Sequence, residues 1–173
     1  MSASETPIWR HGRFEADEWR RFQPEALPAA GQPLLAPLAI FLAEPERFLG
    51  HDGPLGVEVS AGESVGPLKP YLIRLVLIAL AFPKFHDGRN YSAARLLKER
   101  FGYPGEMRAV GDVLADQIPL MRRCGISSFE VRHAPTRAAL LAGRLAEMQH
   151  YYQPIPNAPE APAGTRPWLR QPA

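Results

Sequence analysis

The sequence has a single cysteine, Cys124, among its 173 residues. One cysteine excludes a disulfide within the chain, and one thiolate cannot hold an iron–sulfur cluster without ligands from elsewhere. No apolar run approaches the ~20 residues that a membrane-spanning helix needs. Residues 1–7 also lack the apolar segment of a secretory signal peptide. We therefore expect a cytoplasmic protein that does not enter a membrane.

A dominant charge is also missing, since 20 Lys and Arg residues face 18 Asp and Glu residues and the formal net charge is +2. Nucleic-acid-binding proteins usually concentrate basic side chains on one surface, so this balance argues against a nucleic-acid partner. The sequence has neither a P-loop nor a Gly-x-Gly-x-x-Gly pattern after a strand, and we predict no cofactor. What remains is a chain that is 46% hydrophobic and long enough for one domain with a real core.

The most informative stretch is the unbroken apolar run at 75–82. Apolar residues without polar alternation are typical of a strand that is covered on both faces of a parallel sheet. We predict four more strands, at 34–39, 55–59, 106–110 and 126–132. Helical patterns follow the five strands in turn, at 40–49, 64–72, 92–101, 112–124 and from Pro135 along an apolar stripe of Leu141, Leu145 and Met148.

This alternation predicts an α/β fold with a mainly parallel sheet of about five strands flanked by helices. An open three-layer sheet and a half-barrel-like sheet both fit the pattern. We expect the open sheet, because five units are too few to close a barrel.

The two ends of the chain differ from this core. A small β-hairpin is predicted at 8–15, where a His-Gly pair supplies the turn. The proline-rich residues 153–173 should form a flexible tail, in which Trp168 could anchor a partner. We thus expect one α/β domain at 1–152, with the hairpin and a loop at 1–33 and the core at 34–152.

Several residues mark the expected helix ends. Ser92 and Asp112 are each placed to cap the helix that follows, and Gly102 and Gly125 are placed to end one. Cys124 precedes Gly125 at a helix C-terminus, which raises the pKa of a thiol. We therefore expect Cys124 to be a buried structural residue rather than a nucleophile.

Ligands of parallel sheets bind beyond the carboxyl ends of the strands. Three loops fill this place here, at 83–91, 111–112 and 133–134, and they meet if the last three strands are neighbours. The polar side chains of these loops and of the residues just after them are Lys84, His86, Asp87, Arg89, Tyr91, Ser92, Asp112, Gln117 and His133.

Arg89 is the leading candidate for binding an anion, because a guanidinium can bind two oxygens of an oxyanion. Gly88 lets the backbone approach a ligand closely. Tyr91, Ser92 and Lys84 are candidate supporting ligands, and free N–H groups at the start of the next helix favour an anion there as well.

Each of these residues also has a purely structural interpretation. Asp87 and Gly88 form a common turn pair, and Arg89 can simply pair with Asp87 or Asp112. Tyr91 can cover the core. His86, Asp112 and His133 could in principle meet at a metal, but the histidines lack ligand spacing, so we predict no metal site.

The central segments of the chain are similar to those of a known bacterial family. The similarity lies in residues 82–97, 102–114 and 121–125. Together they resemble the domain of unknown function numbered nine-three-four, whose members are often labelled "probably involved in sulfite reduction".

The start and end of the chain extend this resemblance, at residues 8–10, 17–19 and 152–154. Two positions depart from the family's pattern. His86 stands where a small or acidic residue is expected, and Pro119 stands where an aromatic or aliphatic residue is usual. Because Pro119 falls inside a predicted helix, we expect a kink there.

The resemblance implies a link to assimilatory sulfur metabolism, since the family's members tend to be encoded beside sulfite reductase. The first hypothesis is an accessory protein that binds sulfite reductase or its electron donor, with sulfite or a related oxyanion at Arg89. The second is an enzyme that acts on a small anionic metabolite, with Asp87, Asp112 or His86 as acid or base. The third is a purely structural partner protein. The lack of a nucleophile–base pair favours the first or third hypothesis.

Overall fold

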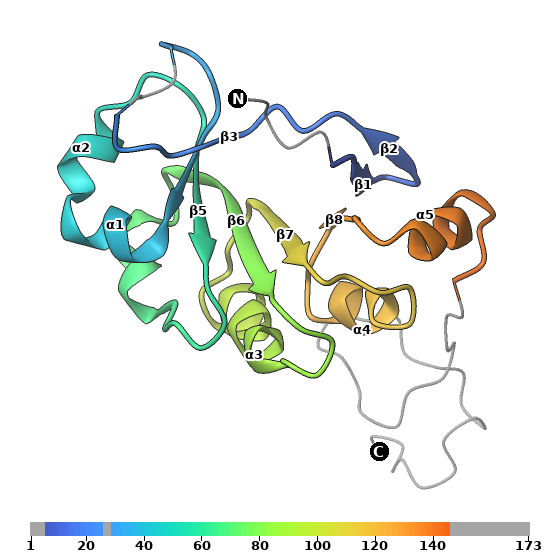
Figure 1. The fold of residues 1–173 in the computed structure, drawn as a ribbon. Helices are drawn as coiled ribbons and strands as arrows, with labels where there is room; N and C mark the ends of the chain where they lie inside the picture. The colour runs from blue at the N-terminus through green and yellow to red at the C-terminus, as the bar shows by residue number, and fades with distance from the viewer. Residues whose placement is uncertain (1–5, 26–28, 146–173) are drawn as a thin grey trace, which may run out of the picture.

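The computed structural model describes residues 6–25 and 29–145. These residues form an α/β fold around one eight-stranded sheet (Figure 1). The strands are β1 (Ile8–Arg10), β2 (Arg13–Glu15), β3 (Arg20–Arg21), β4 (Leu34–Pro37), β5 (Leu55–Val59), β6 (Leu75–Phe82), β7 (Glu106–Gly111) and β8 (Ser128–Glu130). The helices are α1 (Leu38–Ala43), α2 (Pro45–Leu49), the 3₁₀ helix η1 (Gly66–Tyr71), α3 (Arg89–Arg95), the π-helical turn η2 (Leu96–Arg100), α4 (Ile118–Arg123) and α5 (Ala134–Leu141).

The five predicted strands are all present as β4 to β8, and each runs parallel to its neighbours among them. The predicted hairpin is present as β1 and β2. The sheet is nevertheless larger than predicted and mixed, because its order is β2-β1-β8-β7-β6-β5-β4-β3. β1 pairs antiparallel with β8, and β3 pairs parallel with β4. These additions cover backbone groups that would otherwise be unpaired at the edges of the five-stranded sheet.

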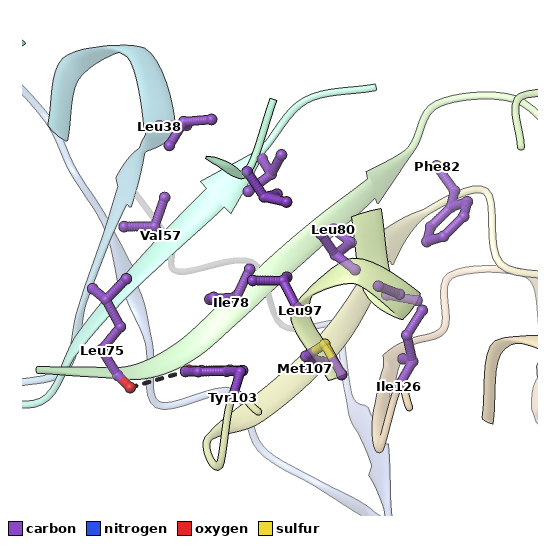
Figure 2. Packing of buried hydrophobic residues seen from close by; sticks show 14 of the residues in the cluster. Leu38, Val57, Leu75, Ile78, Leu80, Phe82, Leu97, Tyr103, Met107 and Ile126 are labelled. Atoms are coloured by element: carbon purple, nitrogen blue, oxygen red, sulfur yellow. Dashed lines mark hydrogen bonds between the residues drawn. The ribbon is translucent and has the colours of Figure 1, made fainter. Parts of the chain in front are cut away.

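The helices of the described chain cover one face of the sheet, so the open three-layer arrangement is wrong. The five parallel strands follow each other in sequence order, and crossovers of one hand that step in one direction stay on one face. The main core accordingly joins residues of every helix to alternate strand residues. Figure 2 shows Ile78, Leu80 and Phe82 of β6 beside Leu97 and Met107 in this core.

The opposite face, which we call the inner face, carries a second and smaller apolar cluster. Among the described residues this cluster contains no helical side chain and consists of Leu35, Leu77, Ala79 and Val110, with Trp19 and Ala81 at its border. β6 is therefore buried on both faces, as predicted. Helices cover one face, and the smaller cluster with Trp19 covers the other. Leu77, Ile78, Ala79 and Leu80 have no exposed surface.

The first half of the chain shows how proline shapes its helices. The predicted helix at 40–49 is divided into α1 and α2 at Glu44, because Pro45 starts a new helix. The predicted short and poor helix at 64–72 is the 3₁₀ helix η1, which contains Pro67 and Pro70.

Tyr103 lies in the core beside the start of β6. Its hydroxyl donates a hydrogen bond of 3.1 Å to the Leu75 carbonyl (Figure 2).

The predicted caps are wrong, although the predicted helix stops are right. α3 starts at Arg89 with Gly88 as N-cap, so Ser92 lies inside the helix. α4 starts at Ile118 rather than after Asp112, because residues 115–117 form a turn before it. Pro119 then lies in the first turn of α4, where it breaks no hydrogen bond and no kink is required. Gly102 and Gly125 follow their helices with φ of +62° and +98°.

The last helix, α5, is shorter than its apolar stripe predicts. It ends at Leu141, which is 71% exposed, while Leu140 is buried. Leu145 packs against the core, as predicted. Met148 and the predicted tail with Trp168 lie outside the described residues. Within the described chain no helix is long and apolar enough to cross a membrane.

Candidate functional site

The first loop of the predicted site follows β6, and the structure places it against the loop after β5, which was not predicted to take part. The loops after these strands touch each other, because the Arg89 side chain packs over Gly62. A Cβ atom at Gly62 would lie 2.7 Å from Nη1 of Arg89, and the φ of Gly62 is +92°. The positive φ is what favours glycine at this position, since the exposed Arg89 side chain could move away from an added Cβ.

Arg89 is paired with Asp87, as the structural interpretation predicts. Its Nε and Nη2 atoms donate hydrogen bonds of 2.9 and 2.7 Å to the two carboxylate oxygens. The hydrogen bond from Arg89 is the main cause that lowers the pKa of Asp87 to about 2. A carboxyl that stays ionised at neutral pH is poorly suited to be a general acid or base there. Asp87 thus occupies the guanidinium N–H groups of Arg89 at which the sequence predicts an oxyanion.

The structure adds Asn90 to this site, a residue that sequence reasoning missed. Its side chain is 1% exposed, and its Nδ2 donates to the Val59 carbonyl at 3.2 Å and to the Ala81 carbonyl at 2.8 Å. Asn90 therefore ties the ends of β5 and β6 together. Its Oδ1 is buried without a hydrogen-bond partner among the described residues. No local sequence pattern distinguishes this asparagine from other loop residues.

Tyr91 packs edge-on against Phe82, with ring centroids 5.1 Å apart. Burial is the main cause that raises the pKa of Tyr91 to about 12, with Cys124 and Asp116 adding to it. The phenol is therefore a hydrogen-bonding group and not a base near neutral pH. The other predicted loop residues, which are Lys84, His86, Gly88 and Ser92, are exposed.

The loop after β7 joins the loop after β6. The backbone N–H of Asp112 donates to the Phe82 carbonyl at 2.7 Å, while the residue as a whole is exposed. Gln117 donates from Nε2 to the Phe85 carbonyl at 2.9 Å. Two of the three predicted loops therefore meet.

His133 belongs to the third predicted loop, and its ring lies beside the start of α5. Its Nδ1 lies 2.9 Å from Oγ1 of Thr136. Within residues 6–25 and 29–145, no three His, Cys, Asp or Glu side chains are arranged to hold a metal ion.

Charged side chains also gather on the inner face of the sheet, where none was predicted. The strand register places Glu58, Ala79, Arg108, Ser128 and Arg10 in one row across five neighbouring strands. Charged residues at alternate positions of β7 and β8, such as Glu106 and Arg108, are the sequence signal that could have revealed this face.

Arg108 is the centre of this inner-face network, and its side chain is 4% exposed. It donates to Asp17 Oδ1 at 2.9 Å and to Glu106 Oε1 at 2.8 Å. Ser128 donates to the same Glu106 oxygen at 2.5 Å. Burial alone would raise the pKa of Glu106, but the charge of Arg108 and the hydrogen bond from Ser128 bring it below its ordinary value.

Arg21 carries the network across the sheet. It donates to Glu58 of β5 at 3.1 Å and to Glu130 of β8 at 2.9 Å, although β6 and β7 lie between these strands. Such a reach requires the sheet to curl toward the inner face. Glu130 is 1% exposed, and Arg132 donates to it as well. Burial would raise the pKa of Glu130, but hydrogen bonds from Arg21 and Arg132 lower it overall.

The chain between β2 and β3 crosses the inner face (Figure 1). We call residues 16–19 the strap. Asp17 of the strap pairs with Arg108, and Trp19 lies against Gly56, where a Cβ would come within 2.8 Å of its ring. The strap therefore places the Asp17 carboxylate over the charged part of the inner face. It places the Trp19 indole beside the apolar cluster of that face.

Cys124 is 6% exposed at the end of α4. Burial is the main cause that raises the pKa of its thiol, and the nearby charges of Arg95 and Arg123 act against it. A thiol with a raised pKa is a poor nucleophile, which agrees with a structural role.

Comparison with protein families matches residues 56–162 to the family described as "Bacterial protein of unknown function (DUF934)". The chain belongs to this family. The match starts at Gly56, so it covers the elements from β5 to α5. The strap and the hairpin lie before it. Neither the curated proteins nor the solved structures contain a match to the chain.

Proposed function

We propose that this DUF934 protein is an accessory protein of assimilatory sulfite reduction, which acts by binding sulfite reductase or its electron donor. The observation that carries the non-catalytic part is the pairing of the charged groups with each other. Asp87 is held by Arg89 at the loops, and Asp17, Glu106 and Glu130 are held by arginines on the inner face. Ion pairs of this kind leave no acid–base pair poised for catalysis among the residues just named.

The link to sulfite reduction rests on the resemblance to this family. Its members tend to be encoded beside sulfite reductase. A binding role agrees with a fold whose charged residues brace a curled sheet.

A small oxyanion such as sulfite is the second part of the proposal, with Arg89 as its main ligand. The side chain of Arg89 is 64% exposed and that of Asp87 is 12% exposed, so the ion pair reaches solvent through the guanidinium. Exposed ion pairs are weakly held and screened by salt. An oxyanion would therefore bind by displacing the Asp87 carboxylate, with Lys84, Tyr91 and Ser92 nearby.

The partner is tested by titrating the full-length protein onto immobilised sulfite reductase and, as a control, onto an unrelated iron–sulfur protein of similar size. We expect saturable binding to the reductase alone. Equal binding to both surfaces, or to neither, would contradict the accessory role.

The oxyanion is tested separately by thermal unfolding with sulfite, sulfate and phosphate. A ligand at a hundred times its Kd should add ~2.7 kcal/mol to the free energy of unfolding. We expect one oxyanion to raise the unfolding midpoint of the wild type but not that of Arg89→Ala. A shift that persists in Arg89→Ala would place the anion elsewhere.

A further inference from the structure

Two arginines meet at the carboxyl end of the inner face, and both bind the same carboxylate. Arg21 is the last residue of β3, and its Nη2 donates to Oε2 of Glu130 at 2.9 Å. Arg132 lies two residues after Glu130, and its Nε donates to Oε1 at 2.8 Å. Glu130 thus holds two guanidiniums that come from distant parts of the chain. We call Arg21 and Arg132 the arginine pair.

The arginine pair keeps hydrogen-bond donors that its ion pairs do not use. Arg21 also donates from Nε to Glu58 at 3.1 Å, and Arg132 also donates from Nη2 to Glu130. Nη1 of each arginine makes no hydrogen bond to any other described residue. The side chains of Arg21 and Arg132 are 38% and 57% exposed, whereas that of Glu130 is 1% exposed. Solvent therefore meets the two guanidiniums, and the carboxylate that fixes them is buried.

Helix ends do not account for the arginine pair. Arg21 belongs to a strand, and Arg132 lies two residues before α5 begins, where the dipole of the helix disfavours a cation. A buried carboxylate does require a cation, but one arginine would balance the charge of Glu130. The second arginine therefore adds a partly exposed guanidinium beside the first.

The arginine pair lies where parallel sheets bind their ligands, which is beyond the carboxyl ends of the strands. Arg21 and Glu130 are the last residues of β3 and β8. Apolar side chains adjoin the arginine pair on the strap side. Leu35 is the register partner of Arg21, and Trp19 lies two residues before Arg21. Both belong to the apolar cluster of the inner face, and Trp19 is only partly buried.

We infer that the arginine pair binds the carboxylate of a small organic acid on the inner face, at a site separate from Arg89. The planar edge of a guanidinium matches the two oxygens of a carboxylate, and Nη1 of each arginine is open to such a ligand. The arginine pair together with Glu58 and Glu130 carries no net charge. A singly charged carboxylate therefore meets less repulsion there than a doubly charged anion such as sulfate.

The test is isothermal titration calorimetry of the full-length protein with benzoate and with sulfate, at one low ionic strength. Benzoate joins a carboxylate to an apolar ring, which can contact Trp19. The test variant is Arg132→Gln. The matched control is Arg13→Gln, because Arg13 pairs with Glu15 two residues away, as Arg132 pairs with Glu130, but without a second arginine of its own kind on β2.

We expect saturable binding of benzoate to the wild type and to Arg13→Gln with the same Kd. The Arg132→Gln variant should bind benzoate at least about tenfold more weakly, since it loses a charge-assisted hydrogen-bonding group. Equal Kd values for the two variants, or no saturable binding to the wild type, would overturn the inference. Tighter binding of sulfate than of benzoate, lost in Arg132→Gln, would overturn the class of ligand.

Arg132→Lys guards against a loss of fold, because lysine keeps the positive charge beside Glu130. We expect circular dichroism and urea unfolding of this variant to resemble those of the wild type. Its affinity for benzoate should still fall several-fold, since an ammonium group lacks the planar edge of a guanidinium. An unchanged affinity would show that the guanidinium does not bind the carboxylate.

Arg89→Ala separates this inference from the proposed function. The variant should bind benzoate as the wild type does, because the loop site takes no part. Loss of benzoate binding in Arg89→Ala but not in Arg132→Gln would place the carboxylate at the loops and overturn the inference. Neither result depends on sulfite reductase, so the accessory role stands or fails by its own test.

Discussion

Two ion pairs of this protein have the same chemistry but differ in how far the arginine is exposed. Asp87 and Arg89 pair at the strand-end loops, where the side chains are 12% and 64% exposed. Asp17 and Arg108 pair on the inner face, where the side chains are 8% and 4% exposed. Water can reach the guanidinium of the first pair and take the place of its carboxylate partner, but it has little access to either side chain of the second pair. Arg89 is therefore open to another partner, whereas the pair on the inner face binds the strap to the sheet.

The largest expected effect is that of Asp17→Ala. The substitution leaves the Arg108 guanidinium buried with one fewer carboxylate, and breaking a buried pair from one side costs about 3–5 kcal/mol. Urea unfolding should show this loss in the free energy of unfolding. The matched control is Asp87→Ala, whose unfolding midpoint we expect to stay near that of the wild type. Similar midpoints for the two variants would contradict the comparison.

Gly56→Ala should have the next largest effect. The added Cβ would lie 2.8 Å from the Trp19 ring and 3.1 Å from Leu77 Cβ, and overpacking of this kind costs about 1–3 kcal/mol. In a Trp19→Ala background the same substitution should cost less, because the ring that it meets is gone. A double-mutant cycle by urea unfolding measures this difference. A cost that does not depend on Trp19 would show that the indole does not pack on Gly56.

The inner face should also make stability depend on pH. The pKa values of Glu106 and Glu130 are lower in the folded protein than the ordinary value of 4.5. The unfolded chain therefore binds more protons as the pH falls, so the stability that is present above about pH 4.5 is lost below it. Urea midpoints between pH 7 and pH 3 should show the loss. Glu130→Gln should reduce the dependence, and an unchanged slope would contradict the role of Glu130.

Ser92→Ala is expected to have the smallest effect. Removal of a serine N-cap typically costs ~1 kcal/mol, but Ser92 is exposed and lies inside α3. Alanine has the higher helix propensity, so we expect a change of a few tenths of a kcal/mol toward greater stability. A loss near 1 kcal/mol in urea unfolding would mean that Ser92 does cap the helix.

The sequence predicts the repeating part of this fold well, because strands and helix stops leave local patterns. The apolar run of β6 and the glycines that end η2 and α4 are examples. Strand order is not local, so the single helix-covered face could not be read from spacing alone. Helix starts were misplaced because Ser92 and Asp112 are good caps in isolation, while turns and Gly88 decide where the helices begin.

The sequence predicts the loop residues of the candidate site, but it does not predict the charged network on the inner face of the sheet. Asp87 and Arg89 lie two residues apart, so their pairing could be anticipated from the sequence. Asp17 and Arg108 lie 91 residues apart, and their contact depends on the strap crossing a sheet whose order was unknown. Charged residues in strands that are otherwise apolar give a hint of such a face but do not identify the partners.

The claim that this protein binds rather than catalyses is tested most directly by following sulfite over time. The purified protein is incubated with sulfite and a reductant, first alone and then with sulfite reductase. We predict no consumption of sulfite by the protein alone between pH 5 and pH 9, and a changed rate of the reductase when the protein is added. Consumption of sulfite by the protein alone, lost in Asp87→Ala, would contradict the account.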